Sequence, residues 1–171
     1  REGVEEDLSL LWTNFLESAT AYIENSELPA DSLVALVNIF MQFQEANSTQ
    51  EGGIQLAEFV QQATQDRIEE LSFEGLVSIF AHYPTLQSIL EEGGVVYMNL
   101  SELMLTEILN QPWTLEGVSH LLDSIQDLEG EIIKNLQSSI YDYLVHEVRL
   151  GNFKAISSLL KLYKVEGIDS V

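Results

Sequence analysis

Apolar residues recur at three- and four-residue spacing through most of the chain, which is the spacing of one face of an α-helix. Proline is scarce, and short polar or glycine-containing stretches separate the periodic segments. This pattern predicts about eight helices and no strand. The expected helices cover residues 5–27, 31–44, 54–70, 73–83, 97–110, 115–127, 131–149 and 153–164. We therefore expect an all-α protein.

Local signals refine the helix ends. Ser72 and Thr114 precede periodic segments and are suited to cap helix N-termini. Pro84 predicts the end of the fourth helix, because proline removes a backbone hydrogen bond, and residues 85–90 then form one more turn. Gly151 is expected in the left-handed conformation that ends the seventh helix. The first helix is expected to bury one apolar face, made of Leu8, Leu11, Trp12, Phe15, Leu16, Ala19, Tyr22 and Ile23.

One ten-residue segment occurs twice, at residues 71–80 and 113–122. Aligning the second helix of each expected hairpin on this segment gives four apolar columns, which predict buried positions. The columns are Leu33, Leu76, Val118 and Ile156; Leu36, Ile79, Leu121 and Leu159; Val37, Phe80, Leu122 and Leu160; and Phe40, Tyr83, Ile125 and Tyr163. A small residue precedes each helix's first column position, and we expect a neighbouring helix to pass close there. These small residues are Ser32, Gly75, Gly117 and Ala155.

Glu-Gly pairs recur about every 40 residues, which is the self-similarity of stacked helical hairpins. The pattern predicts a single domain over residues 1–171, built from four antiparallel hairpins as an α-solenoid. The hairpins cover about 2–44, 51–84, 92–127 and 129–164. A last Glu-Gly pair at 166–167 leads us to expect more of the same, either in a longer array or docked end-on. A plain eight-helix bundle with recurring caps is the alternative.

The pattern Leu-Ser-x-Glu-x-Leu-x-x-Ile-Phe-Ala at residues 71–81 is similar to the second helix of octotricopeptide and heptatricopeptide repeats. This resemblance implies a helical-repeat array in an organelle, with the mitochondrial matrix as the expected compartment. It also implies RNA binding through basic or polar residues on a concave face. Here the first three hairpins contain only Arg1 and Arg67 as basic residues, which departs from that pattern.

Charge narrows the choice of partner. The chain carries a net charge of −21, with 23 acidic and 2 basic residues in 1–130 and 5 of each in 131–171. Binding to nucleic acid depends on Lys and Arg side chains that neutralise phosphates, so residues 1–130 are not expected to bind it. A basic protein partner suits this acidic region, although the carboxylates could simply keep helix faces solvated. The cations left for RNA are Lys154, Lys161 and Lys164.

The sequence contains no catalytic or cofactor motif that we recognise. Cysteine is absent, and His82, His120 and His146 lack the spacing of metal ligands. Glu74 and Glu116 fall in the first turns of two helices, where helix capping explains them. No apolar run is long enough to span a membrane. We therefore expect no enzyme activity, no cofactor and no metal.

These observations favour a non-enzymatic scaffold for protein–protein interaction, as an intracellular and mitochondrial subunit of a larger complex. The alternative is an organellar RNA-binding repeat protein. The second helices of the hairpins would line one wall of the array. The candidate partner-contact residues on that wall are Asn38, Gln42, Ser78, His82, Ser119, Asp123, Ser157 and Lys161. Neither the partner nor the oligomeric state follows from the sequence.

Overall fold

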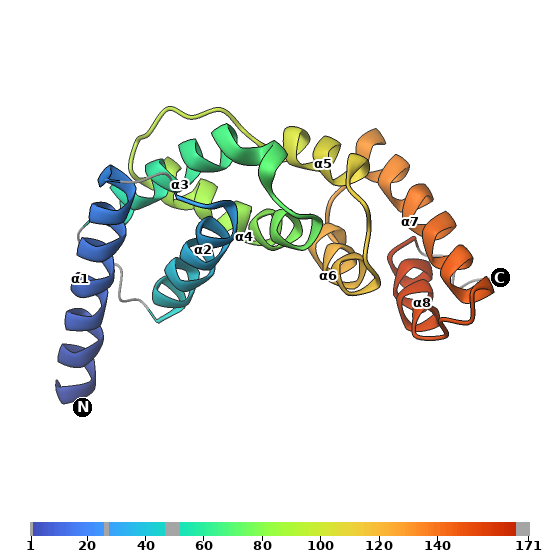
Figure 1. Cartoon of the computed structure of the whole chain (residues 1–171), viewed down its shortest axis with the longest axis horizontal. Coiled ribbons are helices and arrows are strands. Elements are labelled where there is room, and N and C mark those ends of the chain that lie inside the picture. The colour runs from blue at the N-terminus through green and yellow to red at the C-terminus, as the bar shows by residue number, and fades with distance from the viewer. Residues whose placement is uncertain (1, 26–27, 47–51, 167–171) are drawn as a thin grey trace. The chain divides into compact units, whose positions relative to one another are not determined.

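The computed structural model describes residues 2–25, 28–46 and 52–166, and over these ranges the protein is helical (Figure 1). It has eight α-helices, one 3-10 helix and no strand there, which confirms the all-α prediction. The helices are α1 (Glu2–Asn25), α2 (Ala30–Glu45), α3 (Gly53–Arg67), η1 (Ile68–Glu70), α4 (Phe73–Glu92), α5 (Ser101–Asn110), α6 (Leu115–Ile125), α7 (Glu131–Arg149) and α8 (Ala155–Glu166). Residues 47–51 of the loop before α3, and Gly167 of the last Glu-Gly pair, lie outside the described residues.

The chain forms two compact units. Unit 1 comprises Arg1–Leu71 and His82–Leu100, and unit 2 comprises Ser72–Ala81 and Ser101–Val171. Helix α4 therefore contributes its first part to unit 2 and the rest to unit 1. The single domain expected from the sequence stays a prediction.

Helix α4 continues past Pro84 to Glu92, so the prediction that it ends at Pro84 was wrong. Proline has no amide hydrogen and costs a helix interior about 3 kcal/mol. Three side chains beyond it are nonetheless buried, and each such burial is worth about 1.5–3 kcal/mol. They are Leu86, Ile89 and Leu90. Their combined burial outweighs the cost of the proline.

A buried tyrosine fixes the segment between α4 and α5 in unit 1. The Tyr83 hydroxyl donates a hydrogen bond to Oε1 of Gln61 at 2.9 Å and accepts one from the backbone N–H of Leu100 at 2.9 Å. The Gln61 amide donates in turn to the Met98 carbonyl at 2.6 Å. Burial raises the pKa of Tyr83 above its usual value. Because side chains satisfy this backbone, α5 begins at Ser101 and not at residue 97 as predicted.

The two copies of the repeated segment meet within unit 2. Thr114 Oγ1 accepts a hydrogen bond from the backbone N–H of Gly117 at 3.2 Å, as expected of a cap, and Ser72 does the same for α4. The Thr114 hydroxyl also donates to Oε1 of Glu74 at 2.9 Å. A Cβ atom on Gly117 would overlap the ring of Phe73. This overlap explains the small residue at the start of α6.

Aromatic rings extend this contact from α4 to α7. The rings of Phe73 and Trp113 are stacked with centroids 5.9 Å apart, and Trp113 meets Tyr143 edge-on at 5.6 Å. Trp113 itself is half-buried, and its Nε1–H donates to the Ile108 carbonyl at 2.7 Å. In the same unit, α7 packs along α8, α5 packs on α7, and α6 packs on both α7 and α8 (Figure 1). Gly151, with φ of 90°, ends α7 as predicted.

The apolar columns are correct for α2, α4 and α6 and wrong for α8. Every column residue of α2, α4 and α6 is buried except Leu36, which is partly exposed. On α8, by contrast, Ile156, Leu160 and Tyr163 are exposed. The buried face of α8 consists of Ala155, Ser158 and Leu162. Among the described residues α8 packs on α6 and α7, so these neighbours cover only one side of its apolar surface.

Candidate functional site

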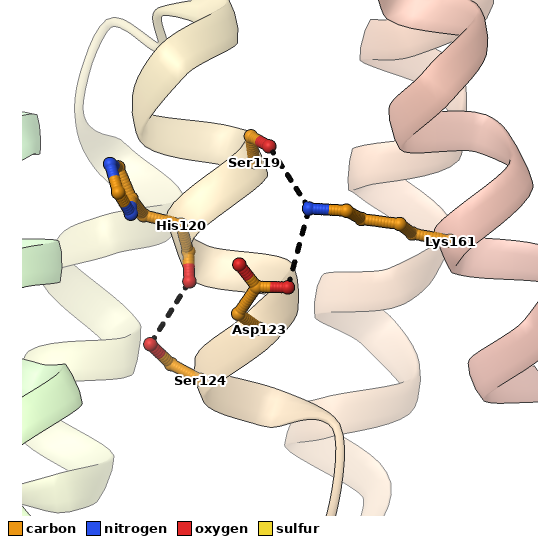
Figure 2. Close-up of polar contacts among 5 residues, drawn as sticks. All are labelled: Ser119, His120, Asp123, Ser124 and Lys161. Atoms are coloured by element: carbon orange, nitrogen blue, oxygen red, sulfur yellow. Dashed lines mark hydrogen bonds and ion pairs between the residues drawn. The ribbon is translucent and has the colours of Figure 1, made fainter.

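Three of the predicted partner-contact residues of unit 2 meet around Lys161. Its Nζ lies 3.4 Å from Oδ1 of Asp123 and 3.5 Å from Oγ of Ser119, so α8 is tied to α6 (Figure 2). The imidazole of His120 points away from this cluster (Figure 2). Both partners of the ion pair are exposed to solvent, so it is worth no more than about 1 kcal/mol. Ser119, Asp123 and Lys161 therefore contact one another, although the sequence predicted that they contact a partner protein.

The other predicted contact residues of unit 2 are Ser78 and Ser157. Ser157 is exposed one turn before Lys161 on α8, whereas Ser78 is half-buried in the first part of α4. The structure brings Ser119, Asp123 and Lys161 into direct contact. A shared role in binding for the whole predicted face stays a prediction.

In unit 1, the predicted contact residues are Asn38, Gln42 and His82. Asn38 and Gln42 lie one turn apart on α2, and Gln42 is exposed. His82 is half-buried on α4, where burial lowers its pKa and the nearby carboxylate of Glu45 opposes that change. The predicted role of these three residues in partner contact stays a prediction.

An apolar groove that the sequence did not predict runs between α1 and α2. Two adjoining hollows of about 400 Å³ and 420 Å³ share Phe15 and Ile39 in their walls. We name this surface the α1–α2 groove. Its main apolar walls are Leu8, Leu11, Phe15 and Tyr22 of α1 and Leu36 and Ile39 of α2. One hollow lies near the turn between the helices and the other near their far ends, so the groove follows the hairpin.

The prediction that α1 buries its whole apolar face was wrong, because part of that face lines the groove. Only Trp12 and Ala19 of that face are buried, while Leu11 is 55% exposed and Tyr22 is 47% exposed. Trp12 packs against Phe40 and Phe43 with ring centroids 5.9 and 5.2 Å apart. This aromatic cluster holds the two helices together beneath the groove. The apolar face of α1 is therefore wider than the part covered within the chain.

The helices of the groove carry acidic side chains and no basic ones. Residues 2–66 contain no lysine, arginine or histidine. Exposed carboxylates on α1 and α2 are Glu6, Asp7, Glu17, Asp31 and Glu45. The negative potential of this hairpin attracts a basic partner and repels phosphate groups.

A second exposed apolar surface lies on α8 and the residues just before it. We name it the α8 stripe, and it consists of Phe153, Ile156, Leu160 and Tyr163, which are 69%, 43%, 64% and 38% exposed. The last three recur at the spacing of neighbours on one helix face. The ring of Tyr163 also meets that of Tyr141 edge-on at 6.4 Å. Residues 148–165 contain four cations and no carboxylate, and one of these cations, Lys161, is paired with Asp123 of α6.

A third hollow, along the first half of α7, has a mixed character. Leu128, Tyr141 and Tyr163 give it apolar walls, and Glu129, Glu131 and Lys134 also line it. Its charged lining distinguishes it from the α1–α2 groove.

Metal chemistry has no visible basis in the part of the chain that the structure describes. There, no group of three or more His, Cys, Asp or Glu side chains could hold a metal ion. None of the described helices is long and apolar enough to cross a membrane. The expected absence of enzyme activity stays a prediction.

Compared with models of protein families, with curated proteins and with solved structures, the chain gives no match. The likeness to octotricopeptide and heptatricopeptide repeats therefore rests on the sequence pattern alone. Its functional interpretation depends on the surfaces described above.

Proposed function

We propose that the protein is a non-enzymatic helical-repeat scaffold that binds other proteins as a structural subunit of a larger complex. The helix contacts in unit 2 support a stacked-hairpin arrangement, because α5 packs on α7 and α6 packs on α8. These pairs join equivalent helices of successive hairpins. Stacked hairpins form extended surfaces that are suited to protein partners.

The α1–α2 groove is the observation that carries this proposal. It is apolar, it follows a whole hairpin, and its walls include the exposed side chains of Leu11 and Ile39. Covering apolar surface contributes about 25 cal/mol per Å². A partner helix can lay side chains at positions i, i+4 and i+7 into such a groove. The acidic helices around it favour a basic helix as the partner.

The geometry supports RNA binding less well. Of the three lysines available to RNA, Lys161 already contacts Asp123 and Ser119. Those contacts place a carboxylate beside the cation that would have to meet a phosphate. RNA affinity depends on such neutralisation, so a carboxylate in this position weakens it.

Affinity capture with wild type and two variants tests the proposal. Ile39→Glu places a carboxylate inside the groove, where Ile39 is 39% exposed, so the fold tolerates the change. Val96→Glu adds the same charge at a 99% exposed position and serves as the control. We expect wild type and Val96→Glu to retain protein partners and Ile39→Glu to bind them at least about tenfold more weakly, because a partner would bury the new charge unpaired. Recovery of nucleic acid without protein, or equal protein capture by Ile39→Glu, contradicts the proposal.

A further inference from the structure

We propose that the α8 stripe of one copy docks in the α1–α2 groove of a second copy, so that the protein associates head to tail. This inference rests on the proposed function because it uses the same groove, and it names the partner as the protein itself. The two surfaces differ, so the contact is heterologous. Repetition of a heterologous contact produces a ring or an open chain of copies.

The arrangement of apolar side chains on α8 supports docking in a groove. Its apolar surface is wider than the face formed by Ala155, Ser158 and Leu162, which its own chain covers. On the uncovered side, Ile156 and Leu160 are one turn apart and point along one row of the helix. This is the spacing of the anchor residues of an amphipathic helix that binds in an apolar groove.

The repeat indicates what kind of element covers the stripe. The buried residues Ala155, Ser158 and Leu162 of α8 lie 37 residues after the buried Val118, Leu121 and Ile125 of α6, so Ile156 and Leu160 correspond to Ser119 and Asp123. Lys161 of α8 contacts Ser119 and Asp123, and α7 also packs on α6. The equivalent positions on α8 therefore match a surface that a helical hairpin covers elsewhere in this chain. Helices α1 and α2 form such a hairpin, with an uncovered groove along it.

Charge favours contact between the α8 stripe and the α1–α2 groove over contact between two stripes or two grooves. The segment 148–165 has four cations, of which Lys161 is paired with Asp123, and no carboxylate, whereas residues 2–66 have carboxylates and no cation. Two stripes or two grooves brought together would each place like charges side by side. The net charge of −21 repels copies at long range, but physiological salt screens charges beyond about 8 Å. The test is therefore made at physiological ionic strength.

Sedimentation velocity of wild type and two variants, alone and mixed, tests the inference. Ile39→Glu blocks the groove and leaves the stripe intact, whereas Leu160→Glu blocks the stripe and leaves the groove intact. Both residues are exposed, so both variants are expected to fold, and circular dichroism verifies this. We expect the mean mass of wild type and of the Val96→Glu control to rise with concentration. Each blocked variant is expected to stay monomeric.

The mixture gives the decisive result. In an equimolar mixture, the intact stripe of Ile39→Glu can dock in the intact groove of Leu160→Glu. The two variants are therefore expected to form a one-to-one dimer and nothing larger. A monomeric wild type, a monomeric mixture, or variants that associate like wild type overturns the inference. A monomeric wild type whose groove still captures another protein overturns the self-docking and leaves the proposed function in place. A groove that binds neither a second copy nor another protein overturns both.

Discussion

The hydroxyl group of Tyr83 organises the polar interior of unit 1. It bonds Gln61 of α3 and the backbone of Leu100, and it holds the irregular segment before α5 against α4. The sequence placed Tyr83 correctly in a core column, but it did not reveal the hydrogen bonds. Gln61 and Leu100 are distant from Tyr83 along the chain, so no local pattern marks them as its partners.

Tyr83→Phe is expected to lower the free energy of unfolding by about 1–3 kcal/mol, because the Leu100 N–H and the Gln61 side chain lose a buried partner. Urea denaturation followed by circular dichroism measures this change. Tyr97→Phe is the matched control, since the Tyr97 hydroxyl bonds the exposed carboxylate of Glu91, and it should change stability by less than about 0.5 kcal/mol. Equal effects of the two substitutions would show that the Tyr83 network does not stabilise unit 1.

At the scale of the elements, local sequence signals were sufficient to predict most of the helices. Apolar periodicity and the residues Ser72, Thr114 and Gly151 placed helix ends that the structure confirms, and α7 has the predicted bounds. The errors at α4 and α5 arise from tertiary contacts. Burial beyond Pro84 extends α4, and the Tyr83 network delays the start of α5. Neither effect is encoded in the few residues around the helix end.

The contact between α4 and α6 depends on Gly117. Overlap of the new methyl group of Gly117→Ala with the Phe73 ring is expected to cost about 1–3 kcal/mol, as overpacking does. Helix propensity returns about 1 kcal/mol, so we expect the free energy of unfolding to fall by up to about 2 kcal/mol. Gly3→Ala, at a helical glycine with open space around it, is the control and should be neutral or slightly stabilising. Thermal unfolding measures both, and a stabilised Gly117→Ala protein would refute the close packing.

For the whole molecule, the sequence indicated a helical repeat but not which of its faces are covered. An apolar residue has the same period whether its own chain or another molecule buries it. Val118 and Ile156 therefore share a column, yet Val118 is buried and Ile156 is exposed. The same ambiguity hid the α1–α2 groove, because Leu11 and Tyr22 read as core residues. The mitochondrial location and the choice of partner stay predictions.

Photo-cross-linking tests the central claim, that the α8 stripe and the α1–α2 groove bind one another between copies. A photoreactive apolar amino acid replaces Leu160, and isotope-labelled and unlabelled copies are mixed before irradiation. We predict cross-linked peptides that join position 160 of one copy to α1 or α2 of the other. These cross-links are expected to disappear when the copy that supplies the groove carries the Ile39→Glu substitution. Cross-links between copies at other surfaces, or none between copies, would contradict the account.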